Sequence, residues 1–256
     1  AYLNKLKTNI KLIKVSNPRI CQEAIKNNCE KYFISKLNIE KYINGQFILI
    51  NDNLSLNFSS FKDEIDMLKD NIFKSTDIDP NEYVRNYLND EIRDEKKLIE
   101  IISNIRKYKV FDNYKIILRP HPTVDLNKYK NYFNKKLDKS LNYLIIREGN
   151  VIEWMLKASI IFHNNCTSSI EGHFRNIENI FNYADSLKPG TSDNFKKLLN
   201  PLGLKGAITN AEKAIALKQD NSHNKIKKTL IRNNEDKNMY DFLGTKIINP
   251  KRYKKN

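Results

Sequence analysis

Short apolar runs alternate with longer amphipathic stretches along most of the chain. The apolar runs are rich in isoleucine and are bounded by turn-forming residues. Continuous runs such as 116–118 and 160–162 are typical of strands that are buried on both faces of a sheet. This pattern predicts strands at residues 10–15, 47–51, 115–118, 143–146, 160–163 and 179–183.

The stretches between these runs have the spacing of helices. Asp79 and Pro80 are typical of a helix start, with Asp as the cap and Pro in the first turn, and this charged helix is expected to run to about Tyr108. Asn150 can cap a short helix that carries Val151, Met155 and Leu156. Further helices are predicted at residues 61–72, 168–174, 211–219 and 225–243.

Alternating strands and helices predict an α/β fold, with a Rossmann-like, doubly wound and mostly parallel sheet whose connections are right-handed crossovers. The strand pattern ends after about Gly206. We therefore expect residues 1–20 to form a first strand and turn that remain from an amino-terminal domain. Residues 21–210 should form the Rossmann-like domain, and residues 211–256 a helical carboxyl-terminal extension with a basic tail.

The composition agrees with the predicted fold, and its net charge adds information about a binding partner. The chain has 256 residues, of which 40% are hydrophobic and 29% are charged, and this suits a globular protein of one or two domains. Lys and Arg total 45 against 30 Asp and Glu, which gives a formal net charge of +15. Such a charge favours an anionic partner. The general abundance of Asn, Lys and Ile, as in a low-GC genome, explains it equally well.

Several classes of protein are excluded by patterns that are missing. No apolar run reaches the ~18–20 residues of a membrane span, and the first residues do not form a signal peptide. The three cysteines lack metal-ligand spacing and a disulfide framework, so we expect a reducing, cytoplasmic location. Dinucleotide-binding and Walker A glycine motifs are absent. Because an initiator Met is missing, we expect the chain to be a fragment or a processed product.

The first candidate site is the sequence Arg-Pro-His-Pro at 119–122, directly after a predicted strand. Ligands of open α/β sheets bind beyond the carboxyl ends of the strands. Two prolines fix this turn, so Arg119 and His121 are expected to point into that crevice. A guanidinium matches phosphate oxygens, and an imidazole can donate a proton or a hydrogen bond to them. A purely structural turn is the alternative.

The second candidate runs from His163 to Gly172, where another predicted strand leads into a helix. Hydroxyl groups and free amides at a helix start bind phosphate well. Thr167, Ser168 and Ser169 are therefore expected to hold a phosphate, and Glu171 to accept hydrogen bonds from ribose hydroxyls. Ser168 and Glu171 also have the spacing of a capping box, so capping the helix is their alternative role.

The remaining candidates are weaker. Arg19 follows the first predicted strand in a Ser-Asn-Pro-Arg turn. Asp77 and Asp79 have the spacing of a metal-binding pair, but a helix cap explains Asp79, and we expect no metal and no cofactor. Cys166 has no second cysteine close in sequence, and Trp154 has the spacing of a packing residue.

With these motifs the chain resembles the carboxyl-terminal half of bacterial surface-carbohydrate-biosynthesis proteins, which are similar to GT-B glycosyltransferases with two Rossmann-like domains. The resemblance covers roughly residues 10–183, and its motifs are specific in combination and order. They are an Asn-Pro-Arg turn at 17–19, a strand ending in Asn at 47–51, Arg-Pro-His-Pro at 119–122, a Glu-Gly to Trp segment at 148–154, His-Asn-Asn-Cys-Thr at 163–167 before Glu171, and a degraded Pro-Val-Ile-x-Tyr at 177–183.

The resemblance implies a nucleotide-sugar donor. Related capsule and lipopolysaccharide transferases carry a His-Pro pair and a Ser/Thr turn that grip the phosphate of a cytidine-activated donor. Carried over, these elements match His121 with Pro122 and Thr167 to Ser169, with Asn165 in the same run. The implied activity is glycosyl transfer from a CMP- or CDP-linked donor to a polysaccharide or lipid-linked acceptor, with His121 as the catalytic residue.

The chain also departs from the family, and other functions stay open. Gly172 stands where relatives often have Ala, and the amino-terminal acceptor domain, which usually supplies the catalytic base, is missing or nearly so. A chain of this kind could bind a donor and transfer nothing. The alternatives are a UDP-sugar epimerase, a non-catalytic basic module that binds nucleic acid, and an accessory protein. Scattered Tyr and Lys argue against specific nucleic-acid binding, whereas the basic tail allows a peripheral contact with an anionic membrane.

Overall fold

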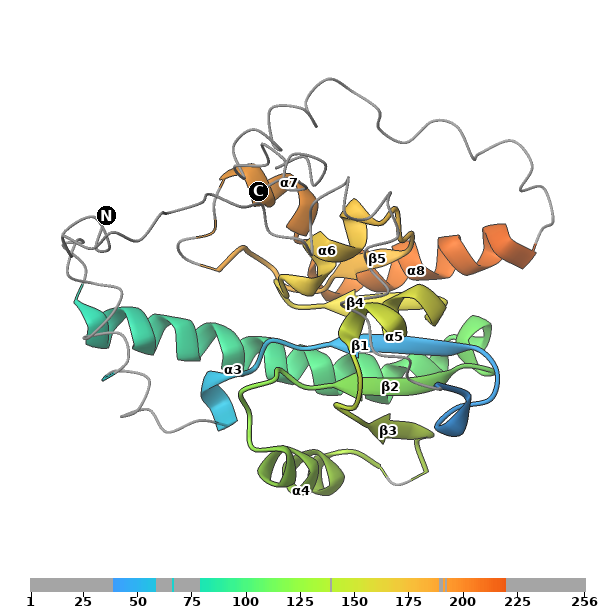
Figure 1. Cartoon of the computed structure of the whole chain (residues 1–256), viewed down its shortest axis with the longest axis horizontal. Coiled ribbons are helices and arrows are strands. Elements are labelled where there is room, and N and C mark those ends of the chain that lie inside the picture. The colour runs from blue at the N-terminus through green and yellow to red at the C-terminus, as the bar shows by residue number, and fades with distance from the viewer. Residues whose placement is uncertain are drawn as a thin grey trace, which may run out of the picture. The chain divides into compact units, whose positions relative to one another are not determined.

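The structure is a computed structural model that describes residues 39–58, 66, 79–138, 140–188, 191 and 193–219 (Figure 1). These residues all belong to one compact unit. Several sequence predictions lie outside them: the strand at 10–15, the turn with Arg19, the helices at 61–72 and 225–243 except for residue 66, and the basic tail.

The centre of the fold is a five-stranded sheet in which every neighbouring pair of strands is parallel. Its order is β3-β2-β1-β4-β5, which is that of a Rossmann-like fold. The predicted doubly wound α/β fold is therefore confirmed. The strands are β1 (Phe47–Asn51), β2 (Lys115–Arg119), β3 (Tyr143–Ile145), β4 (Ile160–His163) and β5 (Ile180–Asn182).

The isoleucine-rich runs form central strands because both of their faces are covered. Alternate residues of each strand point to opposite faces. Ile48 and Ile50 pack with apolar residues of α3, α4 and α8, whereas Leu49 packs with residues of α5 on the other face. The helices are α3 (Pro80–Asn104), α4 (Leu126–Lys136), α5 (Val151–Lys157), α6 (Ser168–Phe174), α7 (Asp193–Leu199) and α8 (Gly203–Gln219).

Local signals in the sequence define several helix starts. The Asp79 side chain accepts a hydrogen bond from the Asn81 amide and so caps α3. Asn150 and Glu153 form a capping box at the start of α5. The long helix that begins at Pro80 ends as an α-helix at Asn104 and continues in two 3₁₀ turns, η5 (Ile105–Lys107) and η6 (Lys109–Phe111). Two further turns, η3 (Ile39–Lys41) and η4 (Leu56–Phe58), flank β1.

Two helices were not predicted from the sequence. In α4 the buried positions are Tyr129 and Phe133, which lie between Lys and Asn residues, so this helix lacks an aliphatic stripe. The other is the short helix α7. The helix predicted at 211–219 begins earlier, at Gly203, and its inner face packs on the core through Ala207, Ala211 and Ile215.

Candidate functional site

The two main candidate motifs leave the sheet on either side of β1. Asn51, the last residue of β1, pairs in register with Arg119 of β2 and with His163 of β4. The strand order reverses here, because β2 and β3 lie to one side of β1 and β4 and β5 to the other. Such a switch point is where open α/β sheets bind their ligands, at the carboxyl ends of the strands. The topology therefore brings the two motifs to one edge of the sheet.

Arg119 holds a neighbouring loop. One terminal nitrogen of its guanidinium donates to the Glu148 carbonyl at 2.9 Å and the other to the Gly149 carbonyl at 2.5 Å. Arg119 is 9% exposed, and burial lowers its pKa to about 10. In this structure the guanidinium therefore fixes the segment between β3 and α5 instead of pointing freely into the crevice, and its part in ligand binding stays a prediction.

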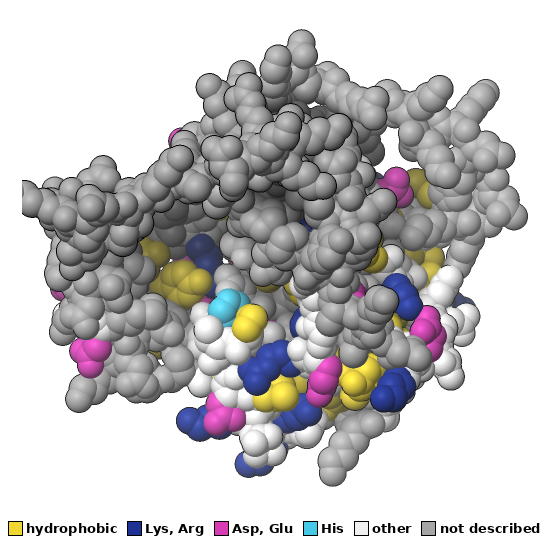
Figure 2. All heavy atoms as spheres, in the orientation of Figure 1, with side chains coloured by type: hydrophobic (Ala, Val, Ile, Leu, Met, Phe, Trp, Pro, Cys, Tyr) yellow, Lys and Arg dark blue, Asp and Glu magenta, His cyan; other side chains and the backbone are white. Residues whose placement is uncertain are grey.

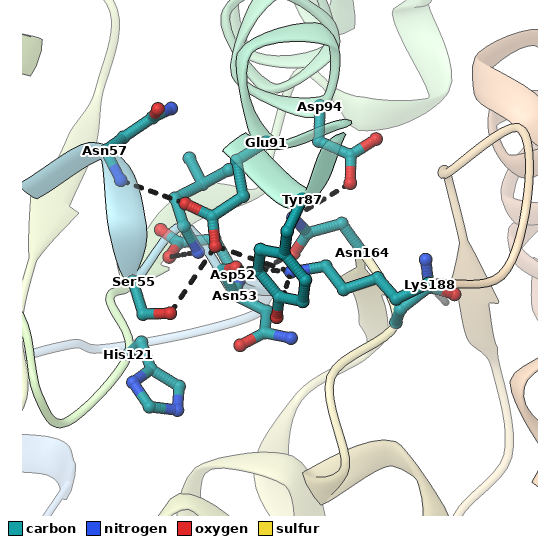
Figure 3. Close-up of polar contacts among 12 residues, drawn as sticks. Asp52, Asn53, Ser55, Asn57, Tyr87, Glu91, Asp94, His121, Asn164 and Lys188 are labelled. Atoms are coloured by element: carbon teal, nitrogen blue, oxygen red, sulfur yellow. Dashed lines mark hydrogen bonds and ion pairs between the residues drawn. The ribbon is translucent and has the colours of Figure 1, made fainter. Parts of the chain in front are cut away.

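His121 lies in the turn after β2 and is half-buried (Figure 3). Its Nδ1 lies 2.8 Å from the Thr123 hydroxyl, and the Thr123 amide donates to the same nitrogen at 3.4 Å. Burial and the nearby charge of Lys188 lower the pKa of His121. With Nδ1 as the acceptor, the neutral imidazole carries its proton on Nε2. His121 can then donate one hydrogen bond from Nε2.

Helix α6 has its predicted bounds, but its capping differs from the prediction. The capping box of Ser168 with Glu171 was wrong, because Thr167 occupies the N-cap position and makes no side-chain cap bond, while Ser168 is already helical. The Ser168 hydroxyl accepts a hydrogen bond from the side-chain amide of Asn51 at 3.4 Å and lies 3.0 Å from Cys166 Sγ. The Ser169 hydroxyl donates to the Cys166 carbonyl at 2.6 Å.

These contacts separate the three predicted hydroxyl groups. Ser168 and Ser169 are buried and bonded to neighbouring groups of the protein, whereas Thr167 is exposed. Glu171 is half-buried in the first turn of α6, and the Arg175 guanidinium binds its backbone carbonyl at 3.0 Å. In this structure Thr167 is the hydroxyl of the run that faces solvent.

Asn165 shapes the turn between β4 and α6. Its φ is 56°, in the left-handed region that Asn tolerates better than most residues. Its side-chain amide donates to the Ser186 carbonyl at 2.9 Å, and its side-chain oxygen accepts from Asn182 at 2.8 Å. Asn165 thus connects the turn after β4 to the segment after β5. Its predicted contact with a ligand is untested.

Sequence reasoning missed a buried polar network that lies beside His121 (Figure 3). The Asn164 side chain accepts from the Asn53 amide at 2.7 Å and donates to the Asp94 carboxylate at 3.3 Å. The Lys188 ammonium lies 3.4 Å from the Glu91 carboxylate, and both side chains are buried. The sequence offers one signal for this network, which is that the polar residues Asp52 and Asn53 directly follow a buried strand.

Asp52 is a buried carboxyl group that directly follows β1. It is 1% exposed and accepts hydrogen bonds from the Tyr129 hydroxyl and, at 3.3 Å, from the Leu54 amide. Burial raises the pKa of Asp52 to about 7, and the negative charge of Glu91 is a smaller cause in the same direction. Hydrogen bonds from Tyr129, Leu54 and the His121 backbone lower the pKa but do not outweigh burial. Asp52 therefore joins β1 to the His121 turn.

Other features of the described part of the chain lie apart from this site. A pocket of about 390 Å³ lies at the opposite edge of the sheet, where Gln46 precedes β1 and Asn142 precedes β3. Within the described residues, no group of three or more His, Cys, Asp or Glu is placed to hold a metal ion. Among the helices described, none is long and apolar enough to cross a membrane.

The visible surface does not show a single basic patch. On the described part of the face in Figure 2, Lys and Arg side chains are interspersed with Asp and Glu. In the exposed ion pairs of Lys157 with Glu40 and of Lys196 with Asp193, basic side chains are likewise paired with acidic ones. This distribution gives no support to a nucleic-acid-binding face on that side.

Comparison with known proteins identifies no family. No family model matches the chain, and a search of curated proteins finds no match. Among solved structures, the chain is similar to UDP-GlcNAc 2-epimerase from Methanocaldococcus jannaschii, which was crystallised with UDP-GlcNAc and UDP. The sequence identity is 14% and the TM-score is 0.42. The match covers 83% of this chain and 50% of the other, so the chain spans about half the length of that protein.

Proposed function

We propose that this chain is the donor-binding part of a glycosyltransferase that uses a nucleotide-activated sugar, CMP- or CDP-linked, in the synthesis of a cell-surface polysaccharide. One observation carries the proposal. The turn with His121 and the turn with Thr167 follow the two strands on either side of β1, at the switch point of the sheet. A phosphate bound there can receive hydrogen bonds from both turns.

The chemistry of the proposed reaction needs donors at this position. Negative charge grows on the leaving phosphate as the bond to the sugar breaks, so preplaced donors stabilise the transition state. In this proposal His121 is the catalytic residue and donates from Nε2, while Thr167 donates from its exposed hydroxyl. Loss of one such donor costs about 2.7–4 kcal/mol of transition-state stabilisation.

The other predicted residues have supporting parts in the proposal. Arg119, Asn165, Ser168 and Ser169 bind protein groups in this structure, so we assign them to holding the two turns in place and lining the phosphate site. Glu171 would accept from ribose hydroxyls. Arg19, outside the described residues, would join the phosphate from the turn after the first predicted strand.

The transfer itself requires more than this chain. In our proposal the base that deprotonates the acceptor hydroxyl lies on an amino-terminal domain, and the acceptor is a polysaccharide or a lipid-linked sugar. The proposed location is the cytoplasm, with contact to the inner face of the membrane through the basic tail. No metal is needed, because the histidine and the hydroxyl groups take over the stabilisation of the leaving phosphate.

Thermal unfolding with CMP, CDP, UDP and GDP tests the proposal, since a ligand that binds only the folded state raises Tm with its concentration. We expect CMP or CDP to give the largest rise and His121→Ala to abolish it. His173→Ala is the matched control, because it removes an imidazole from the far end of α6. If no nucleotide changes Tm, the proposed function is wrong. A response to UDP alone, with epimer or free UDP formed from UDP-HexNAc, would favour an epimerase instead.

A further inference from the structure

Lys188 lies in the segment between β5 and α7. Its ammonium group is bound by residues of the loop after β1 and of helix α3. The Nζ atom donates to the Asn53 carbonyl at 2.9 Å, to the Tyr87 hydroxyl at 2.7 Å and to Glu91 at 3.4 Å. Lysine has three N–H donors, so these contacts use all of them. Figure 3 shows the Lys188 side chain extending toward Tyr87 and Asn53.

The acceptors of Lys188 are themselves fixed. Glu91 on α3 accepts from the Asn57 amide at 3.0 Å and from the Ser55 hydroxyl at 3.4 Å. Both of these residues lie in the loop after β1. The buried ion pair therefore joins three parts of the chain: the loop after β1, helix α3 and the segment after β5.

The segment after β5 is also held at a second point. The Asn165 side chain donates to the Ser186 carbonyl, two residues before Lys188. The turn after β4, which leads to Thr167, and the loop after β1 thus bind the same short segment from two sides. A change in the position of this segment would move the surroundings of both proposed phosphate donors.

We propose that Lys188 is a positioning residue of the candidate site, which locks the segment after β5 against the loop after β1 and helix α3 and so fixes the wall of the site beside His121. The inference rests on the proposed function and deepens it. Lys188 is 8% exposed and its donors are occupied, so it acts through the residues that it holds and does not bind the phosphate itself.

The charges around Lys188 provide a direct readout. Glu91 and Asp94 face it from α3, Cys166 faces it from the turn after β4, and the Tyr87 ring lies under its ammonium with the centroid 4.0 Å away. Across the site, the charge of Lys188 contributes to the lowered pKa of His121, after burial. Removing the ammonium should therefore raise the pKa of His121, whereas an arginine would keep it low.

The experiment compares Lys188→Met with Lys188→Arg in the full chain. The pKa of His121 is followed by NMR titration of its ring protons, and the affinity for CDP by calorimetry. We expect Lys188→Met to raise the pKa of His121 toward its ordinary value and to weaken CDP binding by about 2- to 30-fold, the range for residues that act on a site without touching its ligand. Lys188→Arg should restore both properties in large part. Lys157→Met, which breaks an exposed ion pair with Glu40, should change neither.

Loss of Lys188 leaves Glu91 buried without its cation, and the single variant can fail to fold for that reason. The double variant Lys188→Met with Glu91→Gln removes both charges and serves as the second test, with the same expected results. An unchanged pKa of His121, or unchanged CDP affinity in a folded variant, would overturn the inference. If the wild-type protein binds CMP and not CDP, the affinity for CMP takes the place of the affinity for CDP in this test. If it binds neither, the proposed function fails, and the His121 titration alone then decides whether Lys188 acts on this turn.

Discussion

The side-chain amide of Asn51, at the end of β1, donates to the hydroxyl of Ser168, at the first position of α6, over 3.4 Å. These residues are 117 positions apart in sequence, and both are buried. The bond connects the start of α6 to the end of the central strand. It places the Thr167 turn relative to the sheet, and the proposed phosphate site depends on that placement.

Ser168→Ala should destabilise the protein, because the Ser168 hydroxyl is bonded to neighbouring groups of the protein. The Asn51 amide would lose its acceptor in a buried position, and we expect the free energy of unfolding to fall by about 1–3 kcal/mol. Urea unfolding measures this loss. Thr167→Ala is the matched control: its exposed side chain should change stability by less than about 0.5 kcal/mol while the rise in Tm with CDP is lost. The reverse result would exchange the roles of the two residues.

Arg119→Lys should loosen the segment between β3 and α5. A lysine cannot bind the Glu148 and Gly149 carbonyls in the way that the two guanidinium nitrogens do, and we expect a loss of about 1–3 kcal/mol in the free energy of unfolding. The indole of Trp154, the single tryptophan, donates to the same Glu148 carbonyl at 2.8 Å. Its fluorescence should shift to longer wavelength as water reaches the ring.

Arg106→Lys is the control for this variant. The Arg106 guanidinium binds the carbonyls of Phe111, Asp112 and Tyr114 at the other edge of the sheet. We expect a similar loss of stability with unchanged Trp154 emission. Equal spectral shifts in both variants would show that the emission reports general loosening and not the Arg119 contact.

Asp52 and His163 should have opposite effects on the pH dependence of stability. The pKa of Asp52 rises from 3.8 to about 7 on folding. Its stabilising contribution to the free energy of unfolding is therefore fully present below pH 3.8 and is lost as the pH rises through 7. Burial lowers the pKa of His163 from 6.5 to about 3, so stability is lost as the pH falls from 6.5 toward 3. Between pH 3.8 and 6.5 the two slopes cancel.

Asp52→Asn should remove one of these slopes and expose the other. In this variant the free energy of unfolding should rise with pH between 3.8 and 6.5, by about 1.4 kcal/mol per pH unit. Above pH 7 the variant should be more stable than the wild type, because no carboxylate is buried there. Urea titrations at several pH values measure both effects. His163→Phe should give the opposite slope, and parallel curves for all three proteins would contradict the assignment.

Gly172→Ala tests the packing between α5 and α6. A Cβ atom at this position would lie 2.5 Å from Met155 Cε and 2.8 Å from Ile180 Cδ1. Overpacking of this kind costs about 1–3 kcal/mol, more than the ~1 kcal/mol that Ala gains over Gly inside a helix. We therefore expect a net loss of stability. Since both contacts are with the ends of side chains, adding Ile180→Val should recover part of the loss, and an equally stable single variant would show that the helices already leave room.

The sequence predicts the sheet well because its strands are buried on both faces. Isoleucine-rich runs identified β1 and β4 with their observed bounds, and the other three described strands within one residue at either end. Helix α4 was not predicted because its buried side chains are the aromatic rings of Tyr129 and Phe133, which lie four positions apart among polar residues. The helix predicted at 168–174 has its observed bounds, but its cap was assigned to Ser168 instead of Thr167, because Ser is the better cap by residue type.

The candidate site was predictable only where it follows directly from a strand. His121 and Thr167 could be named as candidates because each follows the end of a strand, and the parallel order of the sheet brings their two turns to one edge. The Lys188–Glu91 pair joins residues 97 positions apart. A charged residue on a long helix ordinarily faces solvent, and nothing in the local sequence of Glu91 distinguishes it from such residues. Tertiary packing alone creates this part of the site.

A proline pairs with the last residue of β5 on the outer side of the sheet. Asn182, its last residue, forms a parallel bridge to Pro201, and the Asn182 side chain also donates to the Leu199 carbonyl at 2.7 Å. Exposed strand edges are templates for pairing with another chain, and proline cannot extend such pairing because it lacks an N–H. At this end of the strand Pro201 therefore limits pairing with another chain, and variants that replace it should be checked for self-association at high concentration.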